Sequence, residues 1–377
     1  MTGAGKRTQD RDAADPHALR VINASGHMTS LGGATLSAGV VEAMRRAAGA
    51  YCDMDRLHEW AAETIVRATG ADAACVVASA AAGIALSVAA VIVGNDPRRV
   101  RRLPDVPEGE RRIAIQAGHL IDFGAEVAQM IRLGGGSVLA VGSANRVDRL
   151  ELEAVMRTRP AGFVFVQSHH AVQRGMLSLG DCVDVARASG VPVLVDAAAE
   201  EDLRRYVARG ADLVIYSGSK AFAGPTSGLV CGRRDLVDGV RAQHRGIGRA
   251  MKIGKEAITG LVQALDEYSA ADRQAVRARE GAVVARFVAA FGRLPGVAVR
   301  AVRDDVRPDI ERAEIQFSGE DERAQARRLV THLRGWTPPV FTRDHRIGEG
   351  ILAFDARPLS DGDADVVVAA VEAFFRG

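Results

Sequence analysis

Residues 193–220 read VLVDAAAEEDLRRYVARGADLVIYSGSK, and two short apolar runs in this stretch are each followed by polar residues. Asp196 follows the first run, and Ser217-Gly218-Ser219-Lys220 follows the second, which is Leu213–Tyr216. Short apolar runs bounded by glycine and polar residues are typical of strands that are buried on both faces. A segment of helical length separates the two runs, so we predict that both are strands of a mostly parallel sheet.

The same alternation continues toward the N-terminus. Further apolar runs, again separated by helix-length segments, lie at Cys75–Ala78, Ile113–Ile115, Val138–Val141 and Phe163–Val166. Amphipathic patterns at Leu36–Ala48 and Leu57–Thr69 predict two helices before them. The fold class that follows is α/β, with a mostly parallel sheet covered by helices on both faces.

The chain is expected to have three parts. Residues 1–20 are polar and are expected to form a flexible arm, 21–254 the large domain, and 255–377 a smaller α+β domain. The last part is predicted to contain a long helix, three strands and a closing helix, at Lys255–Ala290, Val297–Val302, Glu314–Phe317, Ile351–Phe354 and Asp363–Phe375. The charged segment Arg98–Arg112 contains two prolines and is predicted to be a surface excursion.

Composition excludes several classes of protein. The chain has 377 residues, of which 47% are apolar and 25% are charged, with a net charge of +2. This is too apolar for a disordered chain and too close to neutral for a protein that coats nucleic acid. No apolar leader begins the sequence, and the four cysteines, which form no Cys-x-x-Cys pair, indicate neither a zinc site nor disulfides. We therefore expect a cytoplasmic protein.

The uncharged segment Ala73–Asn95 is long enough to span a bilayer. It consists mostly of alanine and valine, and it contains Ser79 and Gly83. We interpret it as a buried strand, a tight turn and a buried helix, and we expect no membrane partner.

Ligands of open α/β sheets bind at the carboxyl ends of the strands, so the residues just after each apolar run are candidates for a site. The small residues Ser79–Gly83 open a helix, whose free N–H groups suit a phosphate. A lysine after a buried strand, here Lys220, can form a Schiff base with a carbonyl. A carboxylate at a strand end, here Asp196, can keep a pyridinium nitrogen protonated. These are the protein groups that pyridoxal phosphate (PLP) requires.

Two sets of motifs carry a family resemblance. The segment Ser217-Gly218-Ser219-Lys220, with 224–228 (GPTSG) after it, resembles the PLP-lysine segment of fold type I, aspartate-aminotransferase-like enzymes. The motifs Asn23-Ala24-Ser25-Gly26, Leu31-Gly32-Gly33 and Leu36-Ser37, and the segment 248–256 (GRAMKIGKE), resemble the selenocysteine synthase-like family. Within it, the chain is most similar to the D-glucosaminate-6-phosphate ammonia-lyase branch.

The resemblance implies a role for each matching residue. Lys220 would be the catalytic Schiff-base lysine and the acid/base at the substrate Cα, and Asp196 would pair with the pyridine nitrogen. His119 would stack on the PLP ring or orient it. The cofactor phosphate would be held by Ser79, Ala80, Ala81, Ser217 and Ser219. The residues implied to bind anionic groups of the substrate or the cofactor are Arg249, Lys252 and Lys255. His169, which follows the apolar run Phe163–Val166, is a further candidate for the substrate site from its position alone.

The implied activity is that of a PLP-dependent ammonia-lyase. It would perform an α,β-elimination on a β-hydroxy amino acid or an amino sugar acid, with or without a phosphate, and give a 2-oxo acid. β-Replacement as in a selenium transferase, racemisation and aldol cleavage remain alternatives, as does a non-catalytic PLP-binding protein. The resemblance also implies a homodimer or a larger even oligomer.

Three other interpretations are less consistent with the residues. Few residues precede Asn23, so the extra domain of a tRNA-acting selenium transferase is not expected, and we expect a small-molecule substrate rather than nucleic acid. Adjacent residues on a strand point to opposite faces, so His169-His170 does not indicate a metal site. The segment Gly246-Ile247-Gly248 does not match a dinucleotide-binding motif, because that motif needs a third glycine at the position where this chain has Met251.

Overall fold

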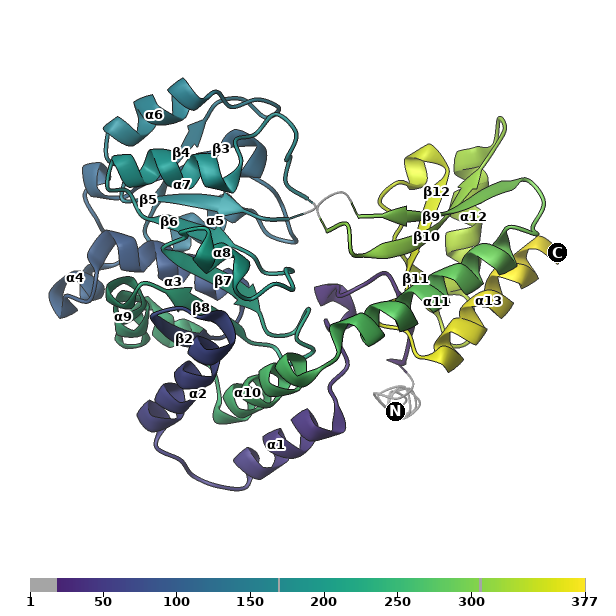
Figure 1. Ribbon diagram of the computed structural model, residues 1–377, viewed down its shortest axis with the longest axis horizontal. Helices are drawn as coiled ribbons and strands as arrows, with labels where there is room; N and C mark the ends of the chain where they lie inside the picture. The colour runs from purple at the N-terminus through teal and green to yellow at the C-terminus, as the bar shows by residue number, and fades with distance from the viewer. Residues whose placement is uncertain (1–18, 169, 305–306, 377) are drawn as a thin grey trace, which may run out of the picture. The chain divides into compact units, whose positions relative to one another are not determined.

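The structure is a computed structural model that describes residues 19–168, 170–304 and 307–376 (Figure 1). The chain divides into two compact units. The large unit is Gly32–Ala271. The small unit combines the described residues up to Leu31 with the chain from Asp272 onward.

A seven-stranded sheet forms the centre of the large unit, with the strand order β2-β8-β7-β6-β5-β3-β4. Strand β8 is antiparallel to both of its neighbours, and every other pair along β7-β6-β5-β3-β4 is parallel. Since β2 and β7 both run opposite to β8, six strands place their carboxyl ends at the same edge of the sheet. The strands are β2 (Ala73–Val77), β3 (Arg112–Gln116), β4 (Ser137–Val141), β5 (Gly162–Val166), β6 (Val193–Asp196), β7 (Leu213–Ser217) and β8 (Gly228–Gly232).

Helices pack against both faces of this sheet, as predicted. Along β2 the side chains alternate, so that Ala74 and Val76 belong to one apolar cluster and Cys75 and Val77 to another. The first cluster is covered by α2 (Met54–Thr69), α6 (Arg149–Arg157), α7 (Leu179–Ala188), α8 (Arg205–Ala208) and α10 (Lys255–Ala270). The second is covered by α3 (Ala80–Val93), α5 (Val127–Leu133) and α9 (Arg234–Ala242), while α1 (Ala38–Ala48) packs on α10.

The uncharged segment Ala73–Asn95 forms strand β2 and helix α3. Nearly every residue of α3 is buried, which explains why its sequence is apolar all round rather than on one face. Within the described ranges, no helix is both long enough and apolar enough to cross a membrane.

The small unit contains a three-stranded antiparallel sheet and a short parallel strand pair. The sheet has the order β12 (Ile351–Asp355), β10 (Glu311–Phe317) and β9 (Val297–Arg303). Strand β1 (Ile22–Ala24) pairs with β11 (Val340–Thr342). Helices α11 (Arg273–Phe291), α12 (Glu322–Arg334) and α13 (Asp361–Arg376) contribute to one apolar core with one face of the sheet, and α11 lies beside α13 (Figure 1).

Some element boundaries differ from the sequence prediction. The long helix expected at Lys255–Ala290 is two helices, because the side chain of Asp272 accepts hydrogen bonds from the N–H groups of Gln274 and Ala275 and starts α11 anew. The segment Arg98–Arg112, expected to be a surface excursion, is mostly exposed and contains part of α4 (Pro97–Arg102) and a short 3-10 helix, Glu108–Glu110.

The boundaries between the two units also differ from the predicted domain boundaries. Helix α10 packs against α1 and α2, so the large unit continues to Ala271 rather than ending at residue 254. Strand β1 belongs to the small unit because its partner is β11. The flexible arm predicted at residues 1–20 falls almost entirely outside the described residues.

Candidate active site

Most of the predicted site residues lie at the carboxyl edge of the large sheet. In the strand register Val77 and Ser217 both lie opposite Gly228, so the ends of β2 and β7 flank the beginning of β8. Asp196 lies opposite Ile215 on one side and Val166 on the other. The turn before α3, the lysine turn after β7 and the carboxylate at the end of β6 are therefore brought to one edge.

The turn that opens α3 has the geometry of an anion site. Ser79 has an extended backbone, and its Oγ accepts the N–H of Ala82 at 3.0 Å. The N–H groups of Ala80 and Ala81 are left without an acceptor inside the helix, because the first turn of a helix has none to offer. These two N–H groups and the positive end of the 14-residue helix α3 face the same edge.

Gly228 allows this turn to lie against β8. A Cβ on Gly228 would come within 2.6 Å of the Ser79 carbonyl carbon and 2.8 Å of the Ala80 nitrogen. Both are backbone atoms, which cannot swing away as a side chain could. The backbone at the start of β8 thus packs directly against the backbone of the turn that opens α3.

The turn after β7 carries Lys220 and two serines. Ser217 is buried, and its Oγ lies 3.4 Å from the Oγ of Ser219. Gly33, with a φ of +81°, lies so close to this turn that a Cβ would be 2.6 Å from the Ser219 carbonyl oxygen. Gly33, the second glycine of the Leu31-Gly32-Gly33 motif, therefore packs against the lysine turn, whereas a Cβ on Gly32 would meet no atom within 4 Å.

Asp196 is buried at the end of β6, and its Oδ1 accepts the N–H of Ala198 at 3.1 Å. Burial raises the pKa of this carboxyl above its usual range, and the nearby positive charge of Lys220 and the bond from Ala198 act against that rise. A desolvated carboxylate of this kind is stabilised by a cation beside it. A protonated pyridine nitrogen is such a cation.

His119 follows β3 and is completely buried. Its Nδ1 accepts the N–H of Val166 at 3.2 Å, so the proton of the neutral ring is on Nε2. Nε2 has no hydrogen-bond partner among the described residues. Burial lowers the pKa of His119 to about 4, so the ring is neutral near pH 7 and retains one unused donor, Nε2–H.

These groups fit PLP. The phosphate would be held by the N–H groups of α3 and the serine hydroxyls, the pyridine nitrogen by Asp196, and the aldehyde carbon by Lys220. Such a ligand would give the unused Nε2–H of His119 a hydrogen-bond partner and would place a cation beside the desolvated carboxyl of Asp196.

The predicted substrate residues are placed differently. Arg249 and Lys252 are exposed, and Gly248 beside them packs on Leu86, about 10 Å along α3 from Ser79. Lys255 donates from Nζ to the carbonyl oxygen of Ala47 at 2.6 Å, so it caps the C-terminus of α1. His169 lies outside the described residues. Within one chain, the described members of this group, Arg249, Lys252 and Lys255, are therefore not brought to the end of β6 with Asp196.

Several supporting residues were missed by the sequence analysis. Gln116, buried at the end of β3, donates to the carbonyl of Leu177 at 3.2 Å and accepts its N–H at 2.8 Å. Three of the four tyrosines hold the loop that follows Asp196. Their hydroxyl groups donate to the Glu200 carboxylate and to the carbonyls of Asp202 and Glu201, from Tyr206 at 2.6 Å, Tyr216 at 2.9 Å and Tyr268 at 2.7 Å. Buried tyrosines need such partners, so this was a signal available in the sequence.

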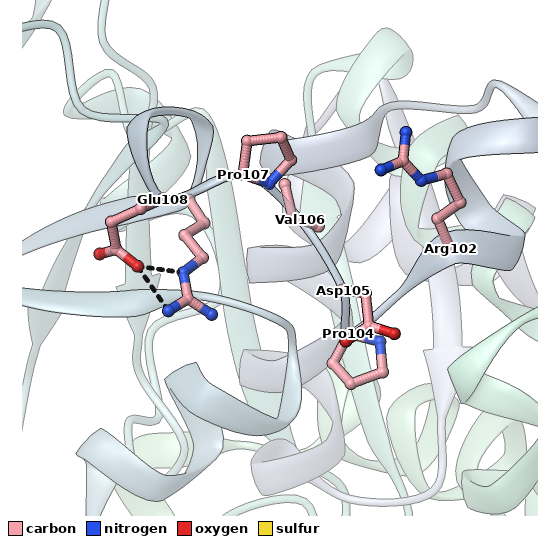
Figure 2. Close-up of a pocket in the computed structure, with 7 residues that line it drawn as sticks. Arg102, Pro104, Asp105, Val106, Pro107 and Glu108 are labelled. Carbon is pink, nitrogen blue, oxygen red and sulfur yellow. Dashed lines mark hydrogen bonds and ion pairs between the residues drawn. The ribbon is translucent and has the colours of Figure 1, made fainter.

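A separate surface hollow of the large unit is not part of this site (Figure 2). Arg111 directly precedes β3, so the hollow lies at the amino end of that strand, opposite to the edge that carries Lys220. Glu108 and Arg111 are paired there, with Nε of the arginine 2.6 Å from the carboxylate. The lining residues are Arg102, Pro104, Asp105, Val106, Pro107, Glu108 and Arg111.

The sheet order and the groups at its edge define a fold type I, PLP-dependent enzyme. The chain belongs to the L-seryl-tRNA selenium transferase family, whose model matches residues 21–284. It is 40% identical over 350 residues to D-glucosaminate-6-phosphate ammonia lyase of Salmonella typhimurium, covering 93% of this chain and 94% of that one. It is 43% identical over 350 residues to 5'-C-glycyluridine monooxygenase-decarboxylase of a Streptomyces species, covering 92% and 88%.

Solved structures agree with the fold. A structure of D-glucosaminate-6-phosphate ammonia-lyase matches with a TM-score of 0.85 and 39% identity, over 95% of this chain and 96% of the other. Serine palmitoyltransferase of Sphingomonas wittichii matches with a TM-score of 0.60 over 94% and 87% of the chains. At 15% identity, the second match shows the fold alone.

Proposed function

We propose that this protein is a PLP-dependent ammonia-lyase. Its substrate is a β-hydroxy amino acid or an amino sugar acid, with or without a phosphate, and its products are a 2-oxo acid and ammonia. The observation that carries the proposal is the meeting of Lys220, Asp196 and the Ser79 turn at one sheet edge. The similarity to the ammonia lyase over 93% of the chain supports this choice of reaction.

When bound, PLP serves as the sink for the electrons that remain at the substrate Cα after its proton leaves. Lys220 accepts that proton on Nζ, a general-base step that contributes roughly 10²–10⁴-fold to the rate. The protonated amine then delivers the proton to the departing β-hydroxyl, which leaves as water. The released enamine takes up water and yields the 2-oxo acid and ammonia.

Asp196 and His119 would both contact the cofactor ring. The carboxylate of Asp196 keeps the ring nitrogen protonated, because the buried anion is stabilised by the cation that it faces. His119 is neutral, so it would stack on the ring or orient it without adding a charge, and its Nε2–H is available as a donor. Both side chains are fixed before any ligand arrives, by the bonds from Ala198 and Val166.

Anchoring of the phosphate and of the substrate uses different parts of the chain. Ser79, Ala80, Ala81, Ser217 and Ser219 hold the cofactor phosphate. We assign the anionic groups of the substrate to Arg249, Lys252 and Lys255, which the resemblance implies, and to His169, which follows a strand of the sheet. Of these, Arg249 and Lys252 are exposed, so they are available to the site of a second copy of the chain.

A site that uses residues of a second copy implies a homodimer or a larger even oligomer. The free thiols and the small-molecule substrate favour the cytoplasm as the location of the protein. Light scattering of the purified protein tests the first statement, and a monomer at micromolar concentration contradicts it. Fractionation of cells that produce the protein at native levels tests the second.

The deciding experiment measures ammonia and 2-oxo acid after addition of D-glucosaminate 6-phosphate and of a panel of unphosphorylated β-hydroxy amino acids. The Lys220→Ala variant is expected to lose both the activity and the borohydride-fixed attachment of PLP. The exposed residue Arg328 on α12 provides a control, and Arg328→Ala should retain both. A Lys220→Ala enzyme with full turnover overturns the proposal.

A second candidate function is an oxygen-dependent decarboxylation of a glycyl nucleoside, because the relative named for that reaction is 43% identical to this chain. The ammonia-lyase reaction needs no oxygen, whereas the decarboxylation consumes it. Ammonia release that persists under anaerobic conditions supports the lyase, whereas oxygen uptake with loss of carbon dioxide supports the alternative. Product analysis separates β-replacement, racemisation and aldol cleavage, and absence of deuterium exchange at Cα would indicate a non-catalytic binder.

A further inference from the structure

Gln116 uses its side chain in the way that a strand uses its backbone. Where the register pairs of β3 with β5 have ended, the Gln116 amide accepts the N–H of Leu177 at 2.8 Å and donates to the Leu177 carbonyl at 3.2 Å. A glutamine amide has the donor and the acceptor of a peptide group, so it can pair with both backbone groups of one residue. Gln116 is completely buried, and it holds the residue just before the N-cap of α7 beside the end of β3.

The three residues after Gln116 form the 3-10 turn that carries His119. Inside this turn, the carbonyl of Gly118 accepts the N–H of Val172 at 3.0 Å. A Cβ on Gly118 would lie 2.8 Å from Sδ of Met176 and 3.0 Å from Cβ of Val172, so the two backbones are in close contact. The stretch of chain between β5 and α7 therefore packs along the His119 turn and is attached to it at Gln116 and at Gly118.

The orientation of the His119 ring depends on where this turn lies. The ring itself contacts strand β5, because Nδ1 accepts the N–H of Val166 at 3.2 Å and the ring meets Phe165 edge-on, with centroids 4.7 Å apart. Those two contacts fix the ring only while the backbone of His119 stays in place. The bonds of Gln116 and Gly118 to the chain beyond β5 hold that backbone. Loss of the Gln116 bonds should therefore be felt at the ring.

We propose that Gln116 is a positioning residue for the cofactor, and that it acts through the His119 turn. Both polar atoms of its amide are engaged by Leu177, so its effect on a ligand passes through the backbone that it holds. This inference rests on the part of the proposed function that places His119 at the ring of PLP. It does not depend on whether the reaction is an elimination or one of the alternatives.

The first experiment replaces Gln116 by methionine, which keeps the length of the side chain and removes the amide. In the apoprotein, hydrogen exchange of segment 170–177 should become faster. The affinity for PLP should fall by about tenfold, since two buried hydrogen bonds that hold the His119 turn are lost. The visible circular dichroism of bound PLP should also change, because that signal reports how the protein surrounds the cofactor ring.

Gln243 provides the matched control. It is also completely buried, and it donates to a backbone carbonyl, that of Gly239, at 3.2 Å. This bond lies within one stretch of four residues and holds no turn at the end of a strand. Gln243→Met should therefore bind PLP with wild-type affinity and dichroism.

Gln116→Glu adds a rescue that depends on pH. A protonated carboxyl can accept from the N–H of Leu177 and donate to its carbonyl, whereas the ionised carboxylate can only accept. Burial raises the pKa of a carboxyl, so the protonated form is reached within the pH range of the assay. The PLP affinity of Gln116→Glu, taken relative to wild type at each pH, should approach one near pH 6 and decrease toward pH 9. The same ratio for Gln116→Met should stay constant.

Wild-type PLP affinity and dichroism in Gln116→Met overturn the inference, and so does an equal loss in Gln243→Met. His119→Ala separates this failure from a failure of the proposed function. If His119→Ala alters the dichroism of bound PLP and Gln116→Met does not, the inference alone is wrong. If neither variant alters it, the role assigned to His119 is wrong as well.

Discussion

Replacement of Gly228 by alanine tests whether the phosphate turn depends on its contact with β8. The new Cβ would lie 2.6 Å from the carbonyl carbon of Ser79, where ordinary contacts begin at 3.4 Å. The turn or the strand must therefore move by about 0.8 Å. Hydrogen bonds span only about 2.7–3.2 Å, so a shift of this size removes an N–H group of Ala80 or Ala81 from reach of the phosphate.

The expected loss follows from that geometry. A hydrogen bond to a charged group contributes about 1.5–3 kcal/mol, so the affinity for PLP should fall roughly 10- to 100-fold. Overpacking of this kind also lowers the free energy of unfolding of the apoprotein by about 1–3 kcal/mol. Neither the charge nor the hydrogen-bonding groups of the site are changed by the substitution.

The assay is a titration of apoprotein with PLP, followed by visible absorbance, together with urea unfolding of the apoprotein. Gly109→Ala is the matched control, because a Cβ on Gly109 meets no atom within 4 Å. This control should bind PLP as the wild type does. A Gly228→Ala protein with wild-type PLP affinity and stability would refute the close contact on which the reasoning depends.

Three further predictions concern single side chains. Asp196→Asn should lower kcat by roughly 10²-fold or more while leaving the apoprotein at least as stable, since burial raises the pKa of this carboxyl and so disfavours its charged form; an active variant measured by ammonia release contradicts the role of the charge. For His119 the pKa of about 4 in the folded protein lies below its usual value of 6.5, so the unfolded chain binds more protons and stability rises with pH across that window. Urea unfolding of the apoprotein should thus show a decline between pH 6.5 and 4, and His119→Phe should remove up to about 3 kcal/mol of it; equal pH dependence in both proteins is the contrary result. Lys255→Met should lower the free energy of unfolding by about 0.5–2 kcal/mol through loss of the bond to Ala47, and a change in KM without a change in stability would instead favour the substrate role.

The parts of the site that lie next to a strand end were predictable from the sequence. Lys220, Asp196 and the Ser79 turn each follow an apolar run, and the topology of a parallel sheet brings such positions together. His119 follows β3 in the same way. The residues that support them are less visible, because Gln116 bonds to Leu177, 61 residues away, and nothing local marks that pair.

The hydrogen bond that Lys255 makes to helix α1 was invisible in the sequence for the same reason. Its ammonium group bonds to Ala47, which is 208 positions away in the sequence, so the basic character of the segment 245–255 gave no sign of a helix-capping role. Strand β8 was missed because two of its five residues are glycines, which weaken a strand pattern. The break at Asp272 was readable in principle, since aspartate is a favoured N-cap residue, but the apolar pattern on both sides masked it.

Strand β1 is paired with β11, and this pairing has a consequence for synthesis of the protein on the ribosome. The Ser25 carbonyl and the Arg343 guanidinium that meet there are 318 residues apart. All of Gly32–Ala271 emerges between these partners, so the larger unit can acquire its sheet while β1 still waits for its neighbour. A fragment that begins after Gly26 would leave β11 with an unpaired edge, which is a surface prone to aggregation.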